Sequence, residues 1–229
     1  MNKRRRLLLR LTLALGLVGL TIYFIPAHEP SQNGKRLSEW LDVLVASNGE
    51  PAAVAAVRAI GTNAVPHLLR RFSFRYSRRR EAFYTEMSRL LHGTLHLKKQ
   101  PIYDPTAIRF IGALRGFEAL GPIASNAVPH LRKLLDTPGA TGQGAGIAMS
   151  YIGPRALPAL IDGLANDSPV VRYHALRGVA PLGTNAAAAL PALLNCLNDT
   201  NSAEVRPFAV SRFLRWVRCI ERQSAGCRS

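Results

Sequence analysis

The string NAVPHLLRRF at residues 63–72 returns as NAVPHLRKLL at residues 126–135. The first six letters of the two strings are identical, although a chain needs an active site only once. Related strings are IGPRALP at residues 152–158, and LGTN at residues 182–185 followed by Leu190-Pro191. A pattern that recurs several times in one chain indicates the structural joint of a repeated unit.

Each joint has an apolar residue and glycine before a polar turn, and an apolar residue and proline after it. Glycine just past a helix can adopt the left-handed conformation that ends the helix, and proline fits the first turn of the next one. Apolar residues then follow at helical spacing, as at Val65, Leu68, Leu69 and Phe72. The copy in the second string departs from this spacing at Arg132. The joints therefore predict that one helix ends and another begins.

A turn that contains aspartate, at Asp104, Asp167 or Asp199, precedes a second helical segment in three of the units. A period near thirty residues that is built from two helices predicts an all-α solenoid, because no unit buries its apolar face alone. We expect about five to six helix pairs over residues 36–218 and no β-strand. The first pair is expected in KRLSEWLDVLVASN and EPAAVAAVRAI, and an inserted loop is expected near residues 94–103.

The combination of G-[TP]-x-A-[VL]-P, an apolar helix, an Asp turn and Val-Arg resembles the HEAT repeat, an armadillo-type fold. The resemblance is to the short bacterial form related to phycobilisome-lyase-type repeats, and it covers residues 36–218. It implies a right-handed α-solenoid and a surface for protein binding. Such arrays serve many purposes, so the resemblance is specific for fold and not for function.

Residues 1–28 have the pattern of a signal anchor or a signal peptide. An uncharged run from Leu11 to Pro26 follows the basic residues Lys3, Arg4, Arg5, Arg6 and Arg10. The bulky Ile25 makes a poor cleavage signature, which favours an uncleaved transmembrane helix at about residues 7–26 in the inner membrane. The positive-inside rule then places the N-terminus in the cytoplasm and the solenoid on the periplasmic side. Secretion after cleavage is the alternative. Residues 29–35 are expected to be a linker and residues 219–229 a tail.

Cysteines and histidines show no pattern typical of a metal or catalytic site. Cys196 lies in an apolar helical run and is expected in the core, while a disulfide between Cys219 and Cys227 is left open. His92 and His96 are four residues apart, the spacing of two metal ligands on one helix face, but no cysteine or carboxylate nearby completes a metal-binding set. His67 and His130 occupy equivalent repeat positions. Di-iron hydroxylases on HEAT-like repeats use repeated His-Glu dipeptides, and the only one here is His28-Glu29. We therefore expect no metal, no cofactor and no catalytic residue, and a non-enzymatic protein.

The glycine cluster from Gly139 to Gly146 lacks the lysine of a phosphate-binding loop. It stands where a second helix should begin. We expect it to permit close helix packing rather than to bind phosphate.

The leading functional hypothesis is a membrane-anchored scaffold that binds an unknown protein partner on the face of the second helices. The candidate partner-binding residues are Arg109, Arg172, Arg177 and Arg206. The resemblance implies that Arg109, Arg172 and Arg206 also make bonds between repeats.

The alternative is a polyanion-binding module centred on residues 70–80, in the stretch RRFSFRYSRRREAFY. The candidate anion-binding residues are Arg70, Arg71, Arg75, Arg78, Arg79 and Arg80, which are interleaved with aromatic residues. The net charge of +16 is consistent with attraction to polyanions. Acidic lipid or envelope polymer is the expected target of an exported domain, and nucleic acid is expected only of a cytoplasmic one. An enzyme of the lyase or hydroxylase kind is the third and least favoured class.

Overall fold

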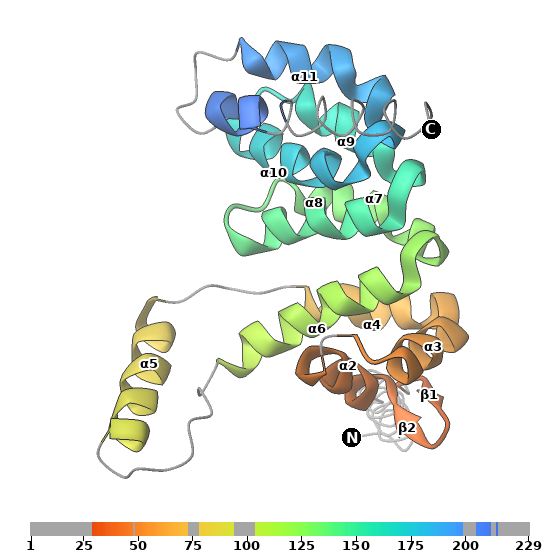
Figure 1. The fold of residues 1–229 in the computed structure, drawn as a ribbon, viewed down its shortest axis with the longest axis vertical. Helices are drawn as coiled ribbons and strands as arrows, with labels where there is room; N and C mark the ends of the chain where they lie inside the picture. The colour runs from red at the N-terminus through yellow and green to blue at the C-terminus, as the bar shows by residue number, and fades with distance from the viewer. Residues whose placement is uncertain are drawn as a thin grey trace, which may run out of the picture. The chain divides into compact units, whose positions relative to one another are not determined.

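The structure is a computed structural model that describes residues 29–47, 49–72, 78–93, 104–198, 205–211 and 214. Its helices follow one another in pairs (Figure 1). The first helices of the pairs are α2 (Leu37–Ala46), α4 (Val65–Arg71), α7 (Val128–Leu134), α9 (Leu157–Leu164) and α11 (Leu190–Leu197). The second helices are α3 (Pro51–Ile60), α6 (Pro105–Leu120), α8 (Ala140–Ile152), α10 (Pro169–Val179) and residues 205–211. A further helix, α5 (Arg78–Gly93), lies between α4 and α6 in the sequence.

The predicted joints are confirmed. Each contains a glycine at positive φ, and the φ values of Gly61, Gly121, Gly153 and Gly183 are 64°, 55°, 86° and 56°. In each case a proline is among the first two residues of the next α-helix. The connecting residues form 3-10 helices, a feature that the sequence analysis did not predict. These are η1 (Gly61–Ala64), η2 (Gly121–Ala127), η3 (Gly153–Ala156) and η4 (Ala180–Ala189). Successive joints contact one another, so the repeated string builds a continuous row.

Each helix pair packs against the next, which confirms the all-α solenoid. Helix α6 contacts α2, α3 and α4, α8 contacts α6 and α7, and α10 contacts α8 and α9. Leu68, Phe117, Met149 and Leu160 are fully buried along one core that continues through these contacts. Stacked neighbours thus cover the apolar faces that single pairs leave exposed.

Helices α8 and α10 approach each other backbone to backbone. A Cβ atom at Gly146 would lie 2.2 Å from the carbonyl oxygen of His174, and one at Gly178 would lie 2.5 Å from the carbonyl oxygen of Gly146. A Cβ at Gly144 would lie 2.4 Å from the ring of Phe110 on α6. The glycine cluster therefore serves close helix packing, as predicted.

The expectation of no β-strand was wrong at residues 31–36. Strands β1 (Ser31–Gln32) and β2 (Lys35–Arg36) form an antiparallel hairpin, with Ser31 opposite Arg36. Asn33 and Gly34, at φ 52° and 76°, make the turn, and Asn-Gly is a strong hairpin signal that the helical pattern obscured. The indole Nε1 of Trp40 donates a hydrogen bond to the Gln32 carbonyl oxygen at 3.0 Å, which ties the hairpin to α2.

The expected anchor helix at residues 7–26, the loop at 94–103, the tail at 219–229 and the pair Cys219 and Cys227 lie outside the described residues. Within the described residues, one helical stretch, Pro51–Arg71, is long and apolar enough to cross a membrane. It includes the joint at Gly61, and its helices pack against α6, so we interpret it as part of the solenoid.

Candidate functional site

Helix α8 presents a narrow stripe of side chains on the surface of the second helices. Ala140, Gln143, Ile147 and Tyr151 are partly exposed, and every other residue of this helix is buried. Their spacing of three or four residues places them on one face. This stripe lies between the exposed side chains of α6 and those of α10, the two second helices that α8 contacts.

The α6 side of the surface carries a charged pair. Arg115 Nη1 donates a hydrogen bond to Glu118 Oε2 at 2.8 Å, and this bond raises the pKa of Arg115. Burial raises the pKa of the Tyr151 phenol, and the negative charge of Glu118 raises it further. The two charges of this pair offset each other.

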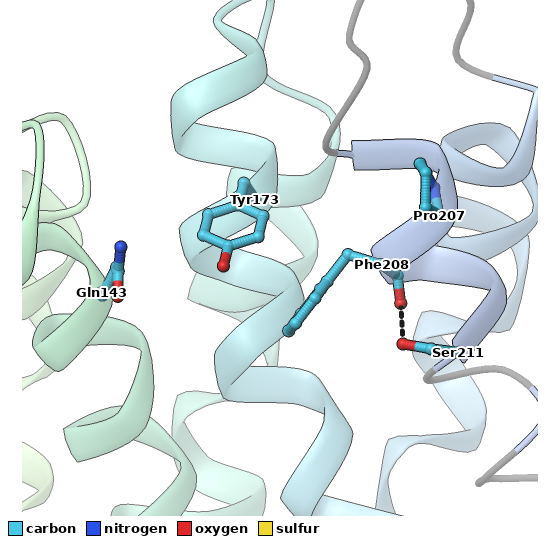
Figure 2. Close-up of a pocket in the computed structure, with 5 residues that line it drawn as sticks. All are labelled: Gln143, Tyr173, Pro207, Phe208 and Ser211. Atoms are coloured by element: carbon cyan, nitrogen blue, oxygen red, sulfur yellow. Dashed lines mark hydrogen bonds between the residues drawn. The ribbon is translucent and has the colours of Figure 1, made fainter.

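The α10 side of the surface contains an open hollow of about 530 Å³ (Figure 2). Its lining comes from α8, α10 and residues 205–211, and consists of Gln143, Tyr173, Pro207, Phe208 and Ser211. The rings of Tyr173 and Phe208 lie 4.8 Å apart, at an angle of 56°. Ser211 Oγ donates to the carbonyl oxygen of Phe208 at 2.8 Å. An apolar wall with a few polar groups is typical of a binding site.

Arg177, one helical turn after Tyr173, contacts two of the lining residues. Its Nη1 lies 3.5 Å from the Tyr173 hydroxyl, and its guanidinium carbon lies 5.9 Å from the ring centre of Phe208. The Nε atom of Arg177 is buried and has no hydrogen-bond partner in the described part of the chain. None of the ion pairs between described residues includes Arg177. Among the described residues, a cation without an anionic partner therefore borders an aromatic hollow.

The structure places the four arginines of the leading hypothesis in different surroundings. Arg172 Nη1 donates to the carbonyl oxygens of Asn166 and Asp167 at 2.8 and 2.7 Å, which ties α10 to the turn before it in the same pair. Arg109 and Arg206 are exposed, and neither lines the hollow. The sequence analysis proposed Arg177 but missed Tyr173, Gln143 and Phe208. The signal for Tyr173 was an aromatic residue at an outward position of a second helix.

The arginines of the alternative hypothesis are only partly described. Arg70 and Arg71 lie in the last turn of α4, and Arg70 Nη2 is 2.8 Å from His67 Nδ1. Arg79 is exposed in the first turn of α5. Arg75 and the side chains of Arg78 and Arg80 lie outside the described residues. Helix α5 also exposes two large apolar side chains, Phe83 at 56% and Leu90 at 50%.

His174 is a buried structural residue of α10. Its Nδ1 lies 2.9 Å from the carbonyl oxygen of Leu135, just past the end of α7, and Gly142 leaves room for the ring. Burial lowers the pKa of His174, so the neutral ring donates the hydrogen bond. Cys196 is buried, as predicted. No cluster of three histidine, cysteine or acidic side chains forms within the described ranges.

Stacked helix pairs with glycine and proline joints define an α-helical repeat protein of the solenoid class. Residues 128–211 match the family model for HEAT repeats, which agrees with the stacked helix pairs in this part of the chain. The match includes α7 to α11 and residues 205–211, and thus Tyr173, Arg177 and Phe208 of the candidate site. No curated protein sequence matches the chain.

Proposed function

We propose that this chain is a membrane-anchored, non-enzymatic scaffold that holds a protein partner on the surface of its second helices. The observation that carries the proposal is the hollow beside Arg177 on that surface. HEAT-repeat arrays offer an extended surface for protein contacts and supply no reactive group of their own. The partly exposed stripe of α8 continues this surface toward α6.

The membrane anchor is proposed from the first thirty residues alone. A basic segment followed by an apolar run supports an uncleaved anchor with a cytoplasmic N-terminus. A C-terminal reporter that is active on only one side of the membrane tests this topology. Activity in the cytoplasm would reject the periplasmic location.

Site-specific photo-cross-linking in cells tests the partner-binding surface. A cross-linking residue replaces Gln143, which lines the hollow, and the matched control replaces Asn195, an exposed residue on the first helix α11. We expect a discrete protein adduct from position 143 and none from position 195. No adduct from position 143, or the same adducts from both positions, would reject this surface as the partner site.

The second candidate function is binding of acidic lipid headgroups by the end of α4 and the start of α5. The exposed Arg79, together with the exposed Phe83 and Leu90, favours it, because basic and apolar side chains on one helix suit a membrane surface. Co-sedimentation of the chain with phosphatidylglycerol vesicles, compared with phosphatidylcholine vesicles, tests this function. Binding that is equal for both lipids and insensitive to Arg79→Gln would reject it.

A further inference from the structure

The proposed function leaves open what kind of partner segment the hollow accepts, and the surroundings of Arg177 bear on that question. Its guanidinium lies over the ring of Phe208 and beside the hydroxyl of Tyr173, while its buried Nε has no acceptor among the residues that the structure describes. A buried donor without an acceptor is costly to the fold. A ligand that draws the guanidinium fork toward the hollow would relieve that cost and give the charge a partner.

A carboxylate fits this cation better than a phosphate does. The planar guanidinium fork matches the two oxygens of a carboxylate and can donate to both. Doubly charged phosphate groups are typically held by several cations, whereas the described residues place one arginine, Arg177, against the hollow and no charged residue in its lining. The large positive charge of the chain favours an acidic partner over a basic one.

The rest of the hollow is suited to a polypeptide. The side-chain amide of Gln143 makes no hydrogen bond within the described part of the chain, so it can both donate to and accept from a peptide backbone. Tyr173, Phe208 and Pro207 form an apolar wall for one neighbouring side chain. The hollow is open rather than closed, which suits a peptide segment more than a small molecule.

We propose that this hollow binds an extended peptide segment of the protein partner, with an aspartate or glutamate on Arg177 and an adjacent apolar side chain against Tyr173 and Phe208. This inference rests on the proposed function and names the chemistry of the partner at the same site.

Selection from a random peptide library displayed on phage tests the inference. The full chain in neutral detergent micelles is immobilised, and bound peptides are sequenced. We expect enrichment of peptides that carry an acidic residue within a few positions of an aromatic or large aliphatic one. Enriched peptides without an acidic residue, or no enrichment, would overturn the inference.

Affinity measurements on a selected peptide then assign the contact. Arg177→Gln is expected to weaken binding about ten-fold or more, since a charge-assisted pair is lost. Arg155→Gln removes the same charge at an exposed position of η3 that does not line the hollow, and is expected to change affinity less than about two-fold. Replacing the peptide glutamate by glutamine should weaken binding as much as Arg177→Gln does, and this change requires no protein variant. The two changes together should cost little more than either one.

The outcomes separate the inference from the proposed function. If position 143 gives a discrete adduct but Arg177→Gln does not change the affinity for the selected peptide, the acidic-peptide inference is wrong and the proposed scaffold function is retained. The absence of any adduct at position 143 would reject both.

Discussion

Replacing Gly146 by alanine should push α8 and α10 apart. The added Cβ would stand 2.2 Å from the carbonyl oxygen of His174, whereas ordinary van der Waals contact begins at 3.4 Å. The obstacle is backbone in the middle of a helix, so it cannot rotate away as a side chain can. Gly112 in α6 is the matched control, because a Cβ there would meet Leu41 Cβ at an ordinary 3.5 Å.

Two effects with opposite signs set the magnitude of the change. Alanine in place of glycine in a helix stabilises by about 1 kcal/mol. Overpacking typically costs about 1–3 kcal/mol, and a backbone obstacle places Gly146→Ala at the upper end. We therefore expect Gly146→Ala to lower the free energy of unfolding by about 2 kcal/mol. Gly112→Ala keeps only the favourable effect and should raise it by about 0.5–1 kcal/mol.

Urea unfolding of the full chain in detergent micelles, followed by far-UV circular dichroism, measures both changes. If Gly146→Ala has the same free energy of unfolding as the wild type, the backbone contact between α8 and α10 is refuted. A double-variant cycle adds a second check, because Gly178 faces Gly146 across the same contact. Once one alanine has separated the helices, the second should cost less than it does alone.

Three further predictions concern single contacts. The free energy of unfolding should decrease as the pH falls below about 6.5, by at most about 1.4 kcal/mol per pH unit, because His174 binds a proton in the unfolded chain more readily than in the folded one, where it is buried. The decrease should be smaller in His174→Gln. The same pH dependence in His174→Gln as in the wild type would contradict the assignment of this effect to His174. Trp40→Phe removes the bond to the Gln32 carbonyl and should cost about 1 kcal/mol in urea unfolding, whereas Trp40→Phe at wild-type stability would argue against a tied hairpin. Arg58→Ala removes the hydrogen bond that Nε donates to the Ala119 carbonyl oxygen at 2.7 Å, and should lower the free energy of unfolding by about 1 kcal/mol. Arg155→Ala is the comparison and should have a smaller effect, because Arg155 Nη1 lies a longer 3.4 Å from Ser125 Oγ.

The helix pairs could be predicted because their signals are local. Glycine and proline act on the backbone at their own positions, so the joints at Gly61 and Gly153 were readable without knowledge of the contacts. The hairpin at residues 31–36 was also local and readable, since Asn33-Gly34 is a turn signal, but it was overlooked beside the helical pattern.

The candidate site depends on contacts between helices that are distant in sequence. Phe208 contacts Tyr173 of α10, which lies thirty-five residues earlier in the chain, and no local sequence pattern indicates that pair. Arg132 shows the same limit. It breaks the apolar spacing of its repeat, and in the structure its Nε lies 3.5 Å from Asp162 of the next pair. The stacking of the repeats determines which residues form such pairs, so the local sequence does not predict them.

The narrow stripe on α8 restricts how this protein can acquire a new specificity. Of the thirteen residues in α8, all but Ala140, Gln143, Ile147 and Tyr151 are buried, and at two of the buried glycines, Gly142 and Gly146, an added Cβ would meet backbone outside the helix. Substitutions elsewhere in the helix would damage folding before they altered recognition. Divergence among relatives, and any engineering of this surface, should therefore concentrate at these four positions and on the less constrained helix at residues 205–211.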